Sequence, residues 1–395
     1  MCSGGPYLLF VFQDADPRTP TLYCMKLRKL GWIVCLLPFA LQGQEQFRAL
    51  SWKNNLAVHS FLMREVHEQY RQREESLAVA CESPEAMMDY VREVRRRYLD
   101  ILGEMPEKTP LQAQVTGVEH QQGFRMEKIV FQSMPGRYVT ASLYLPEGKG
   151  KHAVTVSLCG HGLHGKRPGA TPVLLARNGI ATLVVDPIGQ GERWQFINEK
   201  GEYATRGATT EHTLLHAGCV AVGTSLAAVQ CWDNHRAIDY LVSRADIDAD
   251  RIGVWGSSGG GTETAYLIGM DERVKAAAIC SYFSQRGRTL ELQGPSDGCQ
   301  HIPHEGEAGI ELADFALMMA PRPVLILTGN MILWTCGEPI GGGRGTEPGL
   351  YGVGCARAGE AFGDGDGARI GKGEAGRTGT VVQTLVVQRS VAPDG

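Results

Sequence analysis

A strand, a sharp Gly-x-Ser-x-Gly turn and a helix follow one another directly in residues 251–270. Ser258 lies at the centre of the turn, between Gly256 and Gly260. A serine at such a turn occupies strained backbone that only small neighbours allow, and the bend raises its hydroxyl clear of the sheet. The amide N–H of Gly259 then points at the oxygen that becomes negative when Ser258 attacks a carbonyl. The motif predicts a serine nucleophile with one oxyanion donor.

A glycine-rich turn between a strand and a helix also occurs in phosphate-binding loops. Such loops carry a Lys after their glycines, or the spacing G-x-G-x-x-G in dinucleotide-binding proteins. Neither pattern occurs around Ser258. The turn therefore favours nucleophilic catalysis over phosphate binding.

A second oxyanion donor is expected from the loop after an earlier strand. The segment "VTVSLCGHGLHGK" supplies a strand followed by His161, Gly162 and Leu163. The amide of Gly162 or of Leu163 is the candidate donor. His161 is a candidate pocket residue, and a structural hydrogen-bonding role explains it better than a role as catalytic base.

Asp186 opens the segment "DPIGQGER", directly after the apolar run 180–185. Ligands bind at the carboxyl edge of open α/β sheets, so Asp186 is a candidate pocket residue. A turn aspartate that caps local amides explains the same residue equally well. The sequence leaves these two roles open.

The elements that must position these residues are apolar runs that alternate with helical stretches. Such alternation predicts a mostly parallel central sheet flanked by helices, an α/β fold. A single helix is expected over 211–243 before the strand that leads to Ser258. The expected strands are 138–145, 153–158, 180–185, 252–255, 274–279 and 324–327.

The region 44–110 is predicted to be a helical lead-in. Helices are expected over 52–75 and 84–102, the second with Ser83 as N-cap and Pro84 in its first turn.

The segment 25–43 has a basic start, an apolar stretch and small or polar residues after it. This pattern is typical of a signal peptide, and the apolar stretch is too short for a stable membrane span. We expect Met25 to be the true start, residues 1–24 to be an upstream extension, and the mature protein to be secreted or periplasmic. A buried helix is the alternative.

The net charge and the composition of the chain exclude several classes of partner. The 395 residues carry a formal net charge of −4 without a basic stripe, so no nucleic acid partner is expected. The 11 cysteines form no C-x-x-C pair, and the 11 histidines lack paired metal-ligand spacing. The sequence indicates no disulfide framework, no metal site and no organic cofactor.

Five segments resemble those of a known family. They are "CGHG", "DPIGQGER", "DADRIGVWGSSGGGTETAYLIGMDERVKAAA", "GPSDGCQHIP" and "ADFALMMAPRPVLIL". With them the chain resembles an alpha/beta hydrolase, close to the secreted carbohydrate esterases described as acetyl xylan esterase-like, over about residues 111–329. The resemblance implies that Ser258 is the nucleophile and that the substrate is a small ester or an acetylated plant polysaccharide.

The acid and the histidine of a catalytic triad are missing from the expected places. In such hydrolases the acid follows the strand that is here 324–327, and the histidine comes later in the chain. This chain offers Asn330, Met331 and Ile332, and it contains no His after Met331. Of the 50 glycines, 17 lie after Cys336. Residues 111–330 are therefore expected to be a truncated core, and 331–395 an irregular Gly-rich tail.

A shift of reading frame explains the missing acid. Met is encoded only by ATG and every Ile codon begins with AT, so reading one base out of step turns Met331-Ile332 into an Asp codon. Trp334-Thr335 yields a second Asp for the same reason.

From Gly343 the other offset permits a helix, a strand, a loop and a closing helix, with a His encoded across Ala368 and Arg369. A genuine Gly-rich disordered tail is the alternative.

The function predicted from the sequence is that of a serine carboxylic-ester hydrolase that deacetylates a carbohydrate. A peptidase of the prolyl oligopeptidase type would share the turn at Ser258, but it normally brings a propeller domain that 44–110 cannot supply. A non-catalytic hydrolase-fold protein is the other alternative, because the chain as written lacks a base.

Overall fold

The computed structural model describes residues 7–12, 21–26, 57–166, 169–292, 297–328, 369–372 and 383–386. The chain divides into two units, 1–61 and 62–395. In the first unit β1 (Tyr7–Phe12) and β2 (Thr21–Lys26) form an antiparallel hairpin. Apart from two residues in β2, the expected signal peptide lies outside the described residues.

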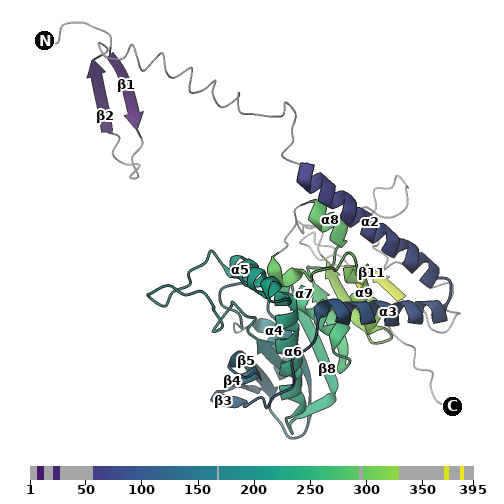
Figure 1. The fold of residues 1–395 in the computed structure, drawn as a ribbon. Helices are drawn as coiled ribbons and strands as arrows, with labels where there is room; N and C mark the ends of the chain where they lie inside the picture. The colour runs from purple at the N-terminus through teal and green to yellow at the C-terminus, as the bar shows by residue number, and fades with distance from the viewer. Residues whose placement is uncertain are drawn as a thin grey trace, which may run out of the picture. The chain divides into compact units, whose positions relative to one another are not determined.

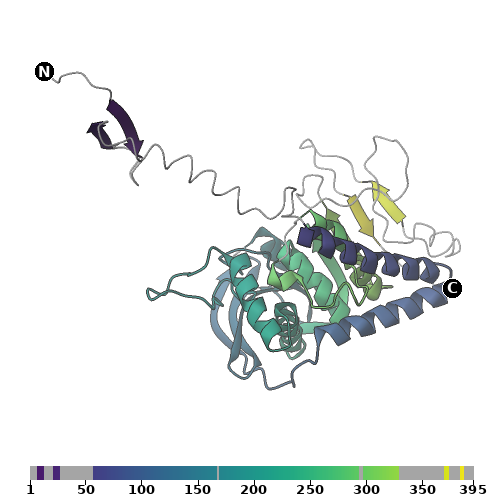
Figure 2. The ribbon, with the colours of Figure 1, turned by 45° about the horizontal axis from the view of Figure 1, so that its top comes forward.

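The lead-in consists of two helices, as expected. They are α2 (Ala57–Ala80), which ends five residues later than predicted, and α3 (Pro84–Leu102). The hydroxyl of Ser83 caps α3 by accepting a hydrogen bond from the Ala86 amide at 3.1 Å. One face of α3 is buried, with Tyr90, Val94, Tyr98 and Leu102 at helical spacing. Figure 2 shows α2 and α3 meeting at their connecting turn.

The sheet of the second unit has the strand order β11-β12-β10-β9-β8-β6-β7-β5-β4-β3. Five neighbouring strands, from β10 to β7, run parallel, as the alternating pattern predicts, and the pairs beyond them are antiparallel. The strand bounds are β3 (Gln114–Gln121), β4 (Phe124–Met134), β5 (Arg137–Pro146), β6 (His152–Leu158), β7 (Ile180–Val185), β8 (Ile247–Ser257), β9 (Val274–Cys280), β10 (Val324–Thr328), β11 (Arg369–Lys372) and β12 (Gln383–Val386). The last two lie in the expected Gly-rich tail.

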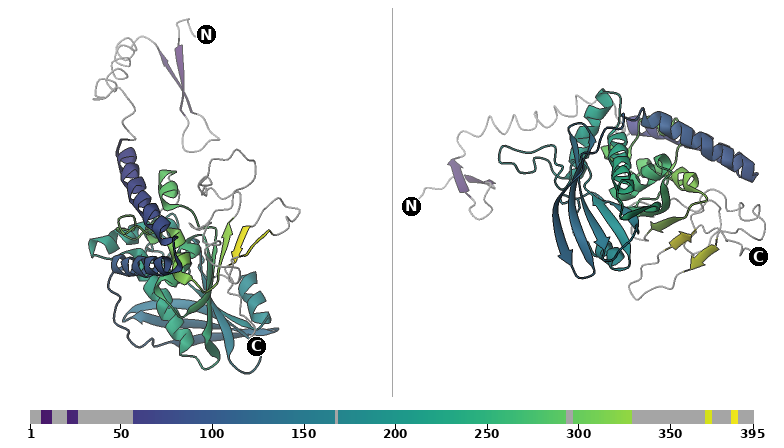
Figure 3. Two further views of the ribbon diagram at one scale, coloured as in Figure 1. Left: turned by 90° about the vertical axis from the view of Figure 1, so that its right-hand side faces the viewer. Right: turned by 90° about the horizontal axis from the view of Figure 1, so that it is seen from below.

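Helices cover both faces of the sheet (Figure 3). On one face, α4 packs over a small cluster of Phe124, Tyr144, Ala176 and Val184. The main core lies on the other face, beneath α3, α6, α7 and α9 (Figure 1). The helix bounds are α4 (Ala170–Arg177), α5 (Ala208–Ala221), α6 (Leu226–Val242), α7 (Gly259–Met270), α8 (Arg286–Glu291), the 3-10 helix η3 (Gly298–Gln300) and α9 (Leu312–Met319).

The prediction of a single helix over 211–243 is wrong, because α5 and α6 are separate helices. Gly223 adopts a φ of +80°, which stops α5, and the hydroxyl of Ser225 caps α6 by accepting from the Ala228 amide at 3.0 Å.

Among the described residues no single helix is long and apolar enough to cross a membrane. The bent pair α5 and α6, at 99°, passes that test only when the two are taken together.

The register brings four strand ends to one edge of the sheet. Leu158 of β6 pairs with Gly256 of β8, Ser257 pairs with Cys280 of β9, and Cys280 pairs with Leu327 of β10. The loops that follow these strands therefore meet beside the turn at Ser258.

Candidate active site

Ser258 has the backbone conformation of a strained strand-to-helix turn, with φ 57° and ψ −124°. Its amide donates to the Cys280 carbonyl at 2.9 Å, and its own carbonyl accepts from the Gly261 amide at 2.8 Å. A non-glycine residue with positive φ is uncommon, and it persists only where the surroundings fix it. The predicted conformation of the turn is present, and the two hydrogen bonds hold it.

Two glycines make the turn possible because other backbone atoms fill the space of a side chain. A Cβ on Gly256 would lie 2.2 Å from the Gly260 carbonyl oxygen. A Cβ on Gly260 would lie 2.0 Å from the Leu158 carbonyl oxygen. The turn is thus packed against the end of β6, and it leaves no room for any side chain at these two positions.

The two predicted oxyanion donors lie on adjoining segments. Gly259 begins α7, so its N–H precedes the first intrahelical hydrogen bonds and is free to bind an anion. The loop after β6 packs directly on the turn, since a Cβ on Gly160 would lie 2.5 Å from the Ser257 carbonyl oxygen. Gly162 and Leu163 follow in that loop and are exposed.

The loop after β6 is held by the segment after β7. The Gln190 side chain donates to the Gly160 carbonyl at 3.0 Å. The Leu163 carbonyl accepts from the Gly191 amide at 3.0 Å and from the Trp194 indole at 3.2 Å. These bonds fix the backbone that carries the second candidate donor.

Asp186 is fully buried, and the structure gives it the local role that the sequence left open. Its carboxylate accepts from the Lys166 amide at 2.7 Å and from the Thr140 hydroxyl at 2.6 Å, and it pairs with the Lys166 ammonium. A Cβ on Gly165 or on Gly191 would lie within 2.1 Å of this carboxylate. Asp186 therefore holds the loop after β6 in place, and both of its carboxylate oxygens bind protein groups.

His161 faces away from solvent and toward a second cluster. Its Nε2 lies 3.1 Å from the Cys299 sulfur and 3.3 Å from the Asp297 carboxylate, and only the first contact has hydrogen-bond geometry. Burial, together with a smaller effect of the neighbouring His212, lowers the pKa of His161 to about 3. His161 is therefore neutral at pH 7, and its contact with Asp297 is not an ion pair.

His212 joins the same cluster from α5. Its Nε2 donates to the Ile188 carbonyl at 2.7 Å, and burial lowers its pKa to about 4. The two imidazole rings stand edge to face with 5.0 Å between their centres. Asp297 is also mostly buried, which raises its pKa, and its carboxylate accepts from the Cys299 thiol at 2.8 Å. Residues from three distant segments thus meet beside the turn.

Glu263 lies on α7 and is only 4% exposed. Its carboxylate accepts a hydrogen bond from the Asn234 amide at 2.8 Å. Burial raises the pKa of Glu263 to about 7, although the hydrogen bond from Asn234 works in the opposite direction. This carboxyl group is partly protonated at neutral pH inside the core.

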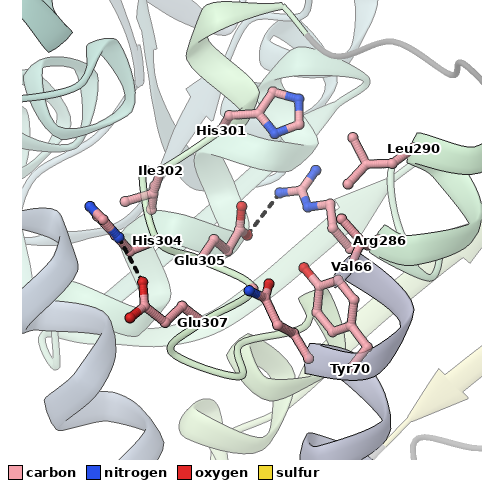
Figure 4. Close-up of a pocket in the computed structure, with 11 residues that line it drawn as sticks. Val66, Tyr70, Arg286, Leu290, His301, Ile302, His304, Glu305 and Glu307 are labelled. Atoms are coloured by element: carbon pink, nitrogen blue, oxygen red, sulfur yellow. Dashed lines mark hydrogen bonds and ion pairs between the residues drawn. The ribbon is translucent and has the colours of Figure 1, made fainter. Parts of the chain in front are cut away.

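A cavity of about 330 Å³ lies between α2 and the segment 301–307. Figure 4 shows Arg286 pointing to Glu305, at 2.9 Å, beside Tyr70 of α2. Arg286 also donates to the hydroxyls of Tyr266 and Tyr282, so its charge is largely satisfied within the protein. Ser258 does not line this cavity. The cavity therefore does not contain the predicted nucleophile.

The predicted place of the triad acid lies among residues 329–368, outside the described residues, and that of the histidine spans Ala368, also outside them, and Arg369, the first residue of β11. No hydrogen bond joins the Ser258 hydroxyl to a base within the described residues. The structure thus places the predicted nucleophile beside the predicted oxyanion donors, and the groups that would activate it lie outside the described residues.

The profile of the acetyl xylan esterase (AXE1) family matches residues 100–302, which is just over half of the 395 residues. The chain belongs to the acetyl xylan esterase family. Its members are carboxylic-ester hydrolases with the alpha/beta hydrolase fold, as the resemblance in the sequence implied. The matched region contains the loop after β6, Ser258 and the cluster around His161.

Individual relatives are distant. YtaP of Bacillus subtilis (strain 168), a candidate hydrolase, is 21% identical over 60% of this chain and 80% of its own length. A candidate acetyl xylan esterase from Bacteroides fragilis NCTC 9343 has the same fold, with a TM-score of 0.54, 19% identity and coverage of 62% of this chain and 69% of its own. The methylesterase BT1017 gives a TM-score of 0.50 at 26% identity, over 65% of this chain and 55% of its own.

Several residues of the site escaped the sequence analysis. His212 lies in a helix without any motif, and Asp297 and Cys299 lie within "GPSDGCQHIP", a segment that carried the family resemblance without residue roles. Their contact with His161 joins positions up to 138 residues apart. The position of that segment within the resemblance could have pointed to Asp297 and Cys299, and no signal in the sequence pointed to His212.

Proposed function

We propose that this acetyl xylan esterase family protein hydrolyses carboxylic esters through Ser258 and removes acetyl groups from a carbohydrate. The observation that carries the proposal is the backbone of Ser258, a non-glycine residue at φ 57° between a buried strand and a glycine-packed helix start. Strain of this kind persists where it serves a function. The substrate class rests on the family and on the names of its relatives, which is an argument from likeness.

The proposed reaction has two acyl-transfer steps. The Ser258 oxygen attacks the ester carbonyl, the alcohol leaves after taking a proton, and water then releases the acid from the acyl-enzyme. In both steps the negative oxygen is held by the N–H of Gly259 and by the N–H of Gly162 or Leu163. No metal or organic cofactor takes part in these steps.

His161 is a poor general base for Ser258. Its Nε2 is engaged with the Cys299 thiol, and its pKa of about 3 leaves it with little affinity for a proton at pH 7. We therefore propose that the base and its acid belong to the segment after β10. The codons of both residues lie there in a shifted reading frame, and the first is the Asp codon that spans Met331-Ile332. The support is that the pattern of the family breaks inside the core and not at a domain boundary.

Sequencing the coding DNA from Leu327 onward tests the shifted frame. An inserted or deleted base near Asn330 and another near Pro339 is the expected result. An unbroken frame would leave a nucleophile without a base, and the chain would then be a non-catalytic member of its family.

Turnover of an activated acetyl ester tests the nucleophile. We expect a burst of alcohol release from the wild type, because acyl-enzyme accumulates before water attacks. Ser258→Ala should abolish the burst, and Ser76→Ala, on exposed α2, should leave it unchanged. Equal turnover by Ser258→Ala and the wild type would refute the assignment.

The peptidase alternative finds no support in the described lead-in. Residues 57–110 form α2, α3 and a connecting segment, and they contain no propeller blade.

We also propose that the protein is exported from a start at Met25, on the basis of the pattern of 25–43. Mass spectrometry of the mature amino terminus after expression in a secreting host would test it, with a new terminus near residue 44 as the expected result.

A further inference from the structure

We propose that His161, His212, Asp297 and Cys299 form a binding site for a transition-metal ion of the Zn²⁺ type. One ligand atom from each residue lies within 4.8 Å of the other three. The residues come from the loop after β6, from α5 and from the segment around η3. A metal here would tie these three segments together beside the turn at Ser258.

The distances within the cluster are close to those of a tetrahedral site. With bonds of about 2.0–2.3 Å from zinc to N, O and S, the ligand atoms of a tetrahedron stand roughly 3.2–3.8 Å apart. The His161 nitrogen lies 3.1 Å from the Cys299 sulfur and 3.3 Å from an Asp297 oxygen. The His212 nitrogen lies 4.0 Å from the other Asp297 oxygen. The four ligand atoms lie within 4.8 Å of one another, so the side chains would draw together by up to about 1 Å to complete the tetrahedron.

Two buried atoms of the cluster lack a hydrogen-bond partner among the described residues. They are Nδ1 of His212, a residue with no exposed surface, and Oδ2 of Asp297. His212 donates its other nitrogen to the Ile188 carbonyl, so Nδ1 carries a lone pair directed into the cluster. Metal-binding histidines are typically oriented by such a bond from the second nitrogen. A bound cation would satisfy both atoms.

The donor set indicates which ion would bind. Two imidazoles and a thiolate suit Zn²⁺ or Co²⁺, whereas Mg²⁺ and Ca²⁺ prefer oxygen ligands. Four protein ligands leave no open position, so the ion would have a structural role. On binding, the Cys299 S–H bond breaks, a metal–sulfur bond forms, and the proton leaves to solvent.

The expected consequence concerns the loop that carries the second oxyanion donor. The His161 ring lies against Gly259, because a Cβ there would approach it to 2.6 Å. A metal bound to His161 would hold this loop against the start of α7. This inference does not depend on ester hydrolysis, since a non-catalytic chain would bind the ion equally well.

Metal content of the full-length protein tests the site. After incubation with ZnSO₄ and exhaustive dialysis, we expect about one zinc per chain in the wild type. Cys299→Ser and His212→Gln should each lower zinc affinity by at least roughly tenfold. Two control variants, Cys219→Ser on α5 and His120→Gln on β3, should keep the wild-type content. Wild-type protein without zinc after this treatment would overturn the proposal.

The absorption spectrum of bound Co²⁺ reports the ligands directly and does not depend on enzymatic activity. We expect the Co²⁺-loaded wild type to show intense visible bands of a tetrahedral site and a thiolate charge-transfer band in the near ultraviolet. Cys299→Ser, with folding checked by circular dichroism, should lose the charge-transfer band. A weak octahedral spectrum from the wild type, or an unchanged band in Cys299→Ser, would refute the ligand assignment.

Discussion

The turn at Ser258 and the cluster around His161 lie side by side, yet they are built in different ways. The turn occupies one short stretch of chain, and its shape is fixed by backbone contacts at Gly256 and Gly260. The cluster joins side chains up to 138 residues apart, and its shape depends on how three segments pack. A geometry fixed by backbone contacts should tolerate almost no substitution. A geometry fixed by side-chain packing should lose stability or function in steps, according to which side chain is changed.

The largest effect is expected where the backbone determines the geometry. Gly260→Ala would place a Cβ 2.0 Å from the Leu158 carbonyl oxygen, and neither side of this contact is a flexible side chain. We expect a loss of more than about 4 kcal/mol in the free energy of unfolding, or insoluble protein. The matched control is Gly162→Ala, where nothing lies within 4 Å of the new Cβ. Urea unfolding curves that coincide for both variants would contradict the comparison.

A buried side-chain contact elsewhere should give the next largest effect. Arg73 of α2 and Asp314 of α9 form a buried ion pair, with atoms 2.7 Å apart and Asp314 1% exposed. Arg73→Met should cost about 3–5 kcal/mol, because it leaves an uncompensated carboxylate. The exposed Arg71–Glu68 pair on the same helix is the control, and Arg71→Met should leave the free energy of unfolding almost unchanged. Chemical denaturation of both variants measures the difference. Similar losses would show that α2 does not pack as described.

Glu263, on the helix after the turn, should make the free energy of unfolding depend on pH. The pKa of Glu263 is about 7 in the folded protein and near 4.5 when unfolded. Between these values the folded state binds more protons than the unfolded state, so stability is greatest at low pH and falls as pH rises from about 4.5 to 7. This group alone should account for about 3 kcal/mol.

Glu263→Gln keeps the hydrogen bond to Asn234 and removes the titration. We expect the variant to lose less stability than the wild type between about pH 5 and pH 8, measured by urea unfolding. Parallel pH profiles for the two proteins would exclude Glu263 as the titrating group.

The smallest effect tests the strain in the turn itself. Ser258→Gly should raise the melting temperature by an amount equivalent to about 1 kcal/mol, because glycine adopts φ 57° without steric strain. The same variant should lose ester turnover. Calorimetry that shows Ser258→Gly to be less stable than the wild type would argue against strain at this position.

The same contrast explains what could be predicted from the sequence. The turn at Ser258 and the parallel strands were predicted because each depends on neighbouring residues. Strand β3 escaped because its residues are almost all exposed and carry no apolar alternation. The break between α5 and α6 escaped because Gly223 interrupts an otherwise helical pattern.

Long-range contacts of cysteine and histidine side chains could not be predicted from the sequence. Cys81 is disulfide-bonded, although the sequence indicated no disulfide framework. The spacing of the histidines indicated no metal site, and the site that we propose joins the β6 loop, α5 and the segment around η3, a combination that spacing along the chain cannot report. Such sites become visible only in three dimensions.

Covalent labelling tests the central claim, that Ser258 is the nucleophile, most directly. The full-length protein is treated with a fluorophosphonate, digested and analysed by mass spectrometry. Our account predicts one adduct, on the peptide that contains Ser258, which disappears in Ser258→Ala and remains in Ser76→Ala. The absence of an adduct on Ser258 in the wild type, or an adduct that persists in Ser258→Ala, would contradict it.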